Sequence, residues 1–329
     1  MTTVPVLPRS EVVGRPRFEG SNICTWIGFK HVMYVVEEAV LEHLRRSGLQ
    51  PRRLYEDHDL GVEIVDSDAR ILTALHMDDE VYTEVVSLPP DDGPDGRGAM
   101  VFRVETYPSG TRTKAVTATV RVLLRAGASA GTDAGTDAGT DAGTDAGTDV
   151  GAAPPPELAP HVVPTLDRPT DAPADTRTDD DLVAGANAIL WRRRIPYFYC
   201  HFSERLQHSG YLRLMEEVVD VFLAERGISI RTMLDTRRWI PVVPRARVEI
   251  LAEATMEEEI LTVLTVEDVF KRLTYTARMD CYVRRSGRLV HTATGRITHG
   301  YAAVLDRRHW ALVSFDDTTL AALRGEGRR

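Results

Sequence analysis

Two short loops, each directly before a long apolar stretch, carry the side chains best suited to chemistry. The second loop and the residues after it contain Glu204, His208 and Tyr211, and the first loop contains Asn22. Carboxylate, imidazole and phenol groups act as general acids and bases. The first amides of a helix have no intrahelical acceptor, so they stabilise negative charge. The loops therefore predict acid–base chemistry at a helix N-terminus, where an oxyanion would be held.

Three of these residues also have a purely structural interpretation. Glu204 would cap the following helix, and His208 would pack against the other half of the chain. Asn22 is a common turn residue that needs no catalytic task.

Two pairs of adjacent glutamates in the apolar stretches, Glu37–Glu38 and Glu216–Glu217, are further candidates for acid–base chemistry. Adjacent helical positions point about 100° apart, so at most one member of each pair faces a given pocket. Glu37 and Glu216 follow Val36 and Met215 on the more apolar side and are expected to point inward. Burial would raise the pKa of such a carboxyl group, although a hydrogen bond to a loop amide is the simpler role.

These candidates depend on two helices that repeat one another. Apolar residues recur at helical spacing in Phe29 to Leu49 and again in Leu206 to Ile228. Aligning Glu37 with Glu216 gives an offset of 216 − 37 = 179, and this offset also maps Gly48 onto Gly227. Each helix is predicted to end at that glycine, which accepts a left-handed conformation. The chain is therefore an internal duplication.

Each predicted helix is followed by segments that alternate apolar and polar residues, which is typical of antiparallel strands. In the first copy these are Val62 to Val86 and the hairpin Met100 to Leu124. In the second copy a strand is expected over Arg194 to Phe202, with further strands across Trp239 to Thr265 and Phe270 to Leu305. A long helix followed by strands, twice over, indicates an α+β fold.

Between the copies, Ala130 to Asp149 repeats Ala-Gly-Thr-Asp. Few apolar side chains are available there to offset the entropy of ordering, so 126–181 is predicted to be a disordered linker. The chain then divides into an N-terminal domain, 1–125, and a C-terminal domain, 182–329.

Composition excludes several classes of function. The 329 residues carry a net charge of −9, which argues against a nucleic-acid surface. No apolar run is long enough to span a membrane and the start is unlike a secretory signal, so a cytoplasmic protein is expected. No metal-ligand cluster or phosphate-binding glycine loop is recognisable, so neither a metal nor another cofactor is expected.

The segments HSGYLRLMEEVVDVFL (208–223) and ARVEILAEATMEEEILTVLTV (246–266), with the hairpin at 273–295, resemble the hotdog fold. They are similar to its thioesterase branch, typified by 4-hydroxybenzoyl-CoA thioesterase. The resemblance implies two tandem hotdog domains that form a pseudo-dimeric double hotdog, with a continuous antiparallel sheet and two central helices on one face.

The resemblance also implies an acyl-thioester hydrolase acting on acyl-CoA or acyl-carrier-protein substrates, with its site at the seam between the copies. Related thioesterases often carry Asp in the pre-helix loop, followed by His and Tyr; His208 and Tyr211 match, and Glu204 stands in for the Asp. The first loop has no Asp, which favours one working site for each pair of copies. A hydroxyacyl-thioester dehydratase or hydratase and a non-catalytic acyl-thioester binding protein remain alternatives, and pairs of chains are possible as homodimers.

Overall fold

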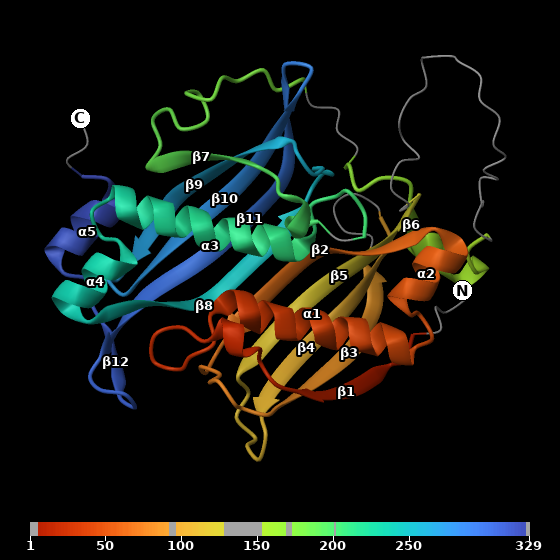
Figure 1. The fold of residues 1–329 in the computed structure, drawn as a ribbon, viewed down its shortest axis with the longest axis horizontal. Coiled ribbons are helices and arrows are strands. Elements are labelled where there is room, and N and C mark those ends of the chain that lie inside the picture. Colours follow the sequence, from red (N-terminus) through yellow and green to blue (C-terminus); the bar gives the residue numbers. More distant parts are fainter. Residues whose placement is uncertain (1–5, 92–96, 128–152, 169–172, 201, 327–329) are drawn as a thin grey trace.

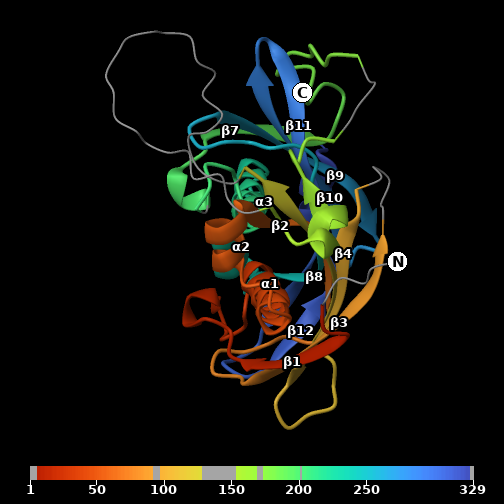
Figure 2. The ribbon, with the colours of Figure 1, turned by 90° about the vertical axis from the view of Figure 1, so that its right-hand side faces the viewer.

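The computed structural model describes residues 6–91, 97–127, 153–168, 173–200 and 202–326. Within these residues a single 12-stranded sheet, antiparallel except for one short pairing, forms the body of the protein. Two long helices lie side by side on one face of this sheet (Figures 1 and 2). This is the arrangement of layers that the duplicated pattern predicts.

The two copies contain corresponding elements in the same order. The first comprises β1 Arg9–Gly14, η1 Phe18–Gly20, α1 Phe29–Arg46, α2 Pro51–His58, β2 Leu60–Ile71, β3 Val81–Asp91, β4 Ala99–Pro108 and β5 Val116–Ala126. The second comprises β7 Ala188–Arg194, η3 Tyr197–Tyr199, α3 His208–Glu225, α4 Ile230–Arg237, β8 Trp239–Ile250, β9 Glu259–Phe270, β10 Thr274–Arg285 and β11 Arg288–Val304. Outside the repeat lie η2 Pro156–His161, β6 Val162–Val163, β12 Trp310–Val313 and α5 Asp317–Arg324. The offset of 179 maps both ends of α1 onto those of α3, since 29 + 179 = 208 and 46 + 179 = 225.

The long helices form where the apolar spacing predicts them. Val32, Val36 and Val40 of α1 are almost completely buried, and each helix ends just before a glycine with positive φ, Gly48 (+83°) or Gly227 (+73°). The left-handed conformation costs glycine little, so it terminates the helix without strain. In the part of the chain that the structure describes, no helix is both long and apolar enough to cross a membrane.

The two copies join along β2 and β8, which pair antiparallel at the centre of the sheet. Asp68 lies opposite Arg247 in the register. The Arg247 guanidinium lies 3.0 Å from Asp66, and that of Arg245 lies 2.9 Å from Asp68. The two seam strands therefore carry opposite charges on one face, and the continuous sheet of the predicted double hotdog is confirmed.

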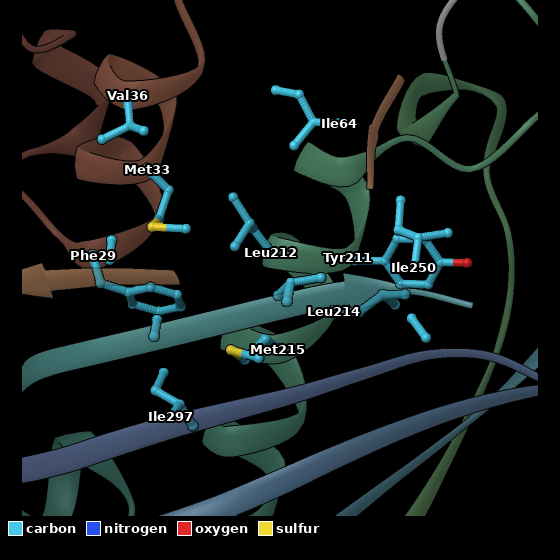
Figure 3. Packing of buried hydrophobic residues seen from close by; sticks show 14 of the residues in the cluster. Phe29, Met33, Val36, Ile64, Tyr211, Leu212, Leu214, Met215, Ile250 and Ile297 are labelled. Carbon is cyan, nitrogen blue, oxygen red and sulfur yellow. The ribbon is translucent and has the colours of Figure 1, made fainter. Parts of the chain in front are cut away.

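One apolar core extends through both copies beneath the helices. Phe29 and Met33 of α1 lie near Met215 of α3 and Ile297 of β11 in this core (Figure 3). The halves are therefore packed against each other as well as joined by the sheet.

Two segments differ from the sequence prediction. The strand expected over Arg194 to Phe202 is β7, which ends at Arg194, and η3 follows. Pro196 explains the difference, because proline has no amide hydrogen for a sheet ladder. Near the N-terminus lies β1, a strand that is absent from the sequence prediction and that pairs with β3.

Part of the predicted linker also has regular structure. The repeat itself falls within 128–152, outside the described residues. Residues 153–168 contain η2 and β6, and β6 pairs with β5. Leu158 and Leu166 are buried against the sheet, so two leucines anchor a segment whose overall composition predicts disorder.

Candidate functional site

His208 lies between the two copies and contacts both of its polar partners across the seam. Its ring Nε2 is 2.6 Å from Ser67 Oγ, and its Nδ1 is 3.2 Å from Glu37 Oε2. His208 and Ser67 are buried, with 4% and 1% of their surfaces exposed. The side chain of Glu37 is 18% exposed. The three side chains form one continuous polar chain that reaches the surface only at the carboxylate.

The chemistry of the partners fixes the roles of the two ring nitrogens when His208 is neutral. An ionised carboxylate only accepts hydrogen bonds, so Nδ1 donates its hydrogen to Glu37. Nε2 then carries the free lone pair and accepts the hydroxyl hydrogen of Ser67. The imidazole is therefore oriented as a base toward the serine hydroxyl, with the carboxylate behind it.

Three elements from both copies position these groups. His208 is the first residue of α3, Glu37 lies in the third turn of α1, and Ser67 lies on the seam strand β2. Successive residues of a strand point to opposite faces. Ser67 therefore faces the helices, while Asp66 and Asp68 face the other side and pair with the arginines of β8.

The internal duplication relates this site to a pseudo-equivalent site at the other end of the seam. That site lacks the Ser–His–Glu hydrogen-bonded chain. The offset of 179 replaces His208 by Phe29, since 208 − 179 = 29, and Ser67 by Ala246, since 67 + 179 = 246. Both replacements are apolar and buried. The third equivalent, Glu216, lies on the surface with 46% of its side chain exposed, 2.6 Å from Lys30. The prediction that Glu216 points inward therefore fails, and only one Ser–His–Glu chain exists among the described residues.

A pocket of about 160 Å³ opens beside Glu37. Its wall includes Ser209, which directly follows His208, and the basic side chains Arg17 and Arg213. Arg213 Nε donates to the Tyr34 hydroxyl at 3.1 Å. The pocket therefore combines a carboxylate that reaches the buried imidazole with a cationic rim.

His31 lies in the wall of the same pocket. Burial, with a smaller contribution from Lys30, lowers the pKa of His31 below its usual value. Gly20 allows this burial, because a Cβ at that position would lie 2.5 Å from the His31 side chain. Burial therefore disfavours the charged form of His31.

The loop before His208 is held by a buried ionic cluster that consists of Glu63, Arg125, Arg205 and Glu253. Arg205 Nη2 lies 3.4 Å from Glu63 Oε1, and Arg125 Nε lies 2.9 Å from Glu253 Oε1. Burial raises the pKa of Glu63, and Arg205 opposes that rise. The cluster connects the second copy's loop to β2 and β5 of the first copy and so fixes the start of α3.

The pseudo-equivalent cluster is apolar. Subtracting 179 from 205 and 253, or adding it to 63 and 125, gives Trp26, Ala74, Val242 and Val304. All four belong to one small hydrophobic cluster under the first copy's loop. The two loops therefore dock at equivalent places, the second through ion pairs and the first through apolar contacts.

The structure does not bring the remaining predicted residues to His208. Glu204 is exposed and has no hydrogen bond to His208 among the described residues; its carbonyl oxygen accepts from the Met256 amide at 2.8 Å. Asn22 is exposed in a turn, and its backbone amide donates to the Trp26 carbonyl oxygen at 2.7 Å. Tyr211 is fully buried in the apolar core (Figure 3), and burial raises its pKa.

Ser67 was not among the candidates from sequence. The segment Val62 to Ile71 places it in a strand of alternating character, on the same face as Ala69. A hydroxyl on the same face as Ala69, at a position where the other copy has Ala246 under the offset of 179, is the signal that identifies it. Among the described residues, no group of three or more His, Cys, Asp or Glu side chains is placed to hold a metal ion.

Comparisons with solved structures identify the fold. No protein-family model and no curated protein sequence matches this chain. Its structure is similar to that of a protein named oleoyl thioesterase from Lactobacillus plantarum, with a TM-score of 0.58, 10% identity and coverage of 91% of this chain and 98% of that one. The fold is the double hotdog.

Two further solved structures share this double hotdog over nearly the whole chain. The 12:0-ACP thioesterase from Umbellularia californica matches with a TM-score of 0.56 and 13% identity, covering 88% of this chain and 93% of that one. An acyl-ACP thioesterase from Bacteroides thetaiotaomicron VPI-5482 matches with a TM-score of 0.52 and 9% identity, covering 88% and 97%. Both halves of the chain and the seam between them therefore belong to the shared fold.

Proposed function

We propose that this protein hydrolyses acyl thioesters of coenzyme A or of an acyl carrier protein at one site on the seam between its two hotdog units. The observation that carries the proposal is the buried His208, whose ring is held by Glu37 and directed at a hydroxyl group. The names of the matched double-hotdog proteins support the choice of thioesters, since all three are thioesterases.

The proposed chemistry assigns a task to each part of the site. His208 is the general base that takes the proton of the attacking hydroxyl group, and Glu37 stabilises the resulting imidazolium. The amides of His208 and Ser209 are the first two of α3 and have no acceptor within the helix. They would donate to the negatively charged oxygen of the tetrahedral intermediate, and the leaving thiolate would take the proton from His208.

The pocket beside Glu37 suits the carrier end of such a substrate. Arg17 is exposed and has no ion-pair partner among the described residues. Coenzyme A and acyl carrier proteins both present the acyl group on a phosphopantetheine arm, whose phosphate would interact with this cationic rim. The acyl group would then extend past Glu37 toward the seam.

Thiol release from a panel of acyl-CoA and acyl-carrier-protein thioesters tests the proposal. The wild-type chain is expected to turn over at least one of them, and His208→Ala is expected to be slower by about 10²-fold or more, the range for loss of a general base. Phe29→Leu, at the pseudo-equivalent position, is the matched control and should keep its rate. An absence of thiol release across the panel, or enoyl formation from a 3-hydroxyacyl thioester without release, would contradict the assignment.

A further inference from the structure

We propose that Ser67 is the nucleophile of this reaction, so that hydrolysis proceeds through an acyl ester on Ser67. This inference rests on the thioester hydrolase function proposed above and adds its covalent step. The observation that carries it is the occupancy of both ring nitrogens of His208.

The geometry assigns the proton that His208 removes. Nδ1 is engaged by Glu37 at 3.2 Å and Nε2 by Ser67 at 2.6 Å. A base accepts a proton only from a group within hydrogen-bond reach. Ser67 is therefore the hydroxyl group that Nε2 deprotonates.

A second buried histidine, His43, shows what the Glu37 carboxylate contributes at His208. His43 also lies between hydroxyl groups, with Nδ1 2.7 Å from Ser10 Oγ and Nε2 2.9 Å from Ser87 Oγ. Within the described part of the chain, no carboxylate forms a hydrogen bond or an ion pair with that ring. Burial lowers the pKa of His43, so its charged form is disfavoured. At the seam, Glu37 stabilises the imidazolium that forms when Ser67 gives up its proton, and this is the requirement for an activated serine.

The location of Ser67 is consistent with acyl transfer. Its hydroxyl group contacts the side chain of His208, the first residue of α3, a helix whose first amides have no acceptor within the helix. It is 1% exposed, and exclusion of water strengthens the interactions that stabilise the oxyanion. Glu37 lies in the pocket wall and contacts the buried imidazole, so it connects the pocket to the polar chain that contains Ser67.

The two steps balance without any further reactant. In the first, Ser67 Oγ attacks the thioester carbonyl carbon as its proton passes to His208 Nε2; the C–S bond then breaks and the thiolate leaves with that proton. In the second, His208 takes a proton from water, whose oxygen attacks the ester carbon. The C–Oγ bond breaks, Ser67 Oγ regains the proton, and a carboxylic acid is released.

Acid quenching within the first turnovers, followed by peptide mass spectrometry, tests the inference on the full chain. Octanoyl-CoA and the best substrate of the panel serve as probes. The wild-type peptide that contains Ser67 should gain the mass of the acyl group, and added hydroxylamine should capture the acyl group in proportion to its concentration. Ser67→Ala should lose the adduct and about 10²-fold or more in rate. Ser67→Cys, which keeps a nucleophile at the same place, should still be acylated.

Ser10→Ala is the matched control, because it removes a similar buried contact between serine and histidine at His43. It should keep both the adduct and the rate. If Ser67→Ala stays folded and retains a rate within about threefold of wild type, the nucleophile is water and the inference fails while the hydrolase function stands. If the wild-type chain hydrolyses no thioester, the proposed function itself fails.

Discussion

Replacing Arg205 by alanine is expected to destabilise the whole chain, because it removes the cation nearest to a buried carboxylate. Arg205 Nη2 lies 3.4 Å from Glu63 Oε1, and the Glu63 side chain is only 4% exposed. Removing one partner of a buried ion pair generally costs about 3–5 kcal/mol. Arg125 also interacts favourably with Glu63 and remains in place. The expected loss is therefore at the lower end of that range, about 3 kcal/mol.

The loss should depend on pH, and its direction follows from Glu63. Burial raises the pKa of Glu63 and Arg205 opposes the rise, so the pKa increases further when Arg205 is removed. A carboxyl group whose pKa is higher in the folded than in the unfolded state destabilises the fold progressively as pH rises above the unfolded value. The cost of Arg205→Ala should therefore be greater near pH 7 than near pH 5.

Urea unfolding of the wild type and Arg205→Ala at the two pH values measures this cost. Arg231→Ala is the control, since Arg231 forms an exposed pair with Asp235 and its removal should leave the unfolding midpoint unchanged. Glu63→Gln added to Arg205→Ala should recover part of the loss, because it removes the unpaired charge. A loss below about 1 kcal/mol, or one of equal size at both pH values, would refute the reasoning about the cluster.

Three further outcomes are expected. Glu37→Gln should lower kcat for thiol release by about 10²-fold, whereas Glu216→Gln at the pseudo-equivalent position should not change it; equal effects would contradict a one-sided site. Arg17→Ala should raise KM several-fold and leave kcat nearly unchanged, because it removes binding that the ground state and transition state share; a fall in kcat alone would exclude that role. Gly210→Ala would place a methyl group 2.8 Å from the Tyr199 carbonyl oxygen, so thermal unfolding should show a loss of about 1–3 kcal/mol; an unchanged midpoint would contradict this packing.

The fold was largely predictable because its signals are local and occur twice. Helical spacing and a terminal glycine mark α1 and α3 within about twenty residues each, and the common offset of 179 relates them. The strand at Arg194 to Phe202 was placed too late, because the apolar character of the segment outweighed Pro196 in the prediction. The anchored part of the linker was missed because composition averages over Leu158 and Leu166.

The site was predictable only in part, because its contacts join residues far apart in sequence. His208 and Glu37 were predicted from their types and from the helices that carry them, but their contact depends on how the copies dock. Ser67 lies 141 positions from His208 and becomes significant only when β2 is placed at the seam. Glu204 was chosen because it stands in the pre-helix loop in place of the Asp of related thioesterases, yet its side chain is exposed at the surface.

The repeated sequence pattern also did not predict how the two copies differ. The offset aligns Arg205 with Trp26 and Glu63 with Val242, so an ionic anchor in one loop corresponds to an apolar anchor in the other. An exchange of loops would place Trp26 against a buried carboxylate and leave a buried charge without its partner. The loop of each copy therefore fits the surface of the other copy and would not fit that of a second identical copy.

A comparison of three variants tests the central claim most directly, which is that Glu37 and His208 act as one unit from opposite copies. The measurement is thiol release from the preferred thioester by His208→Ala, Glu37→Gln and the double variant, each shown to be folded. Groups that act through one another are non-additive, so the account predicts that the double variant is no more than about threefold slower than His208→Ala alone. Multiplied losses, or a wild-type rate in His208→Ala, would contradict it.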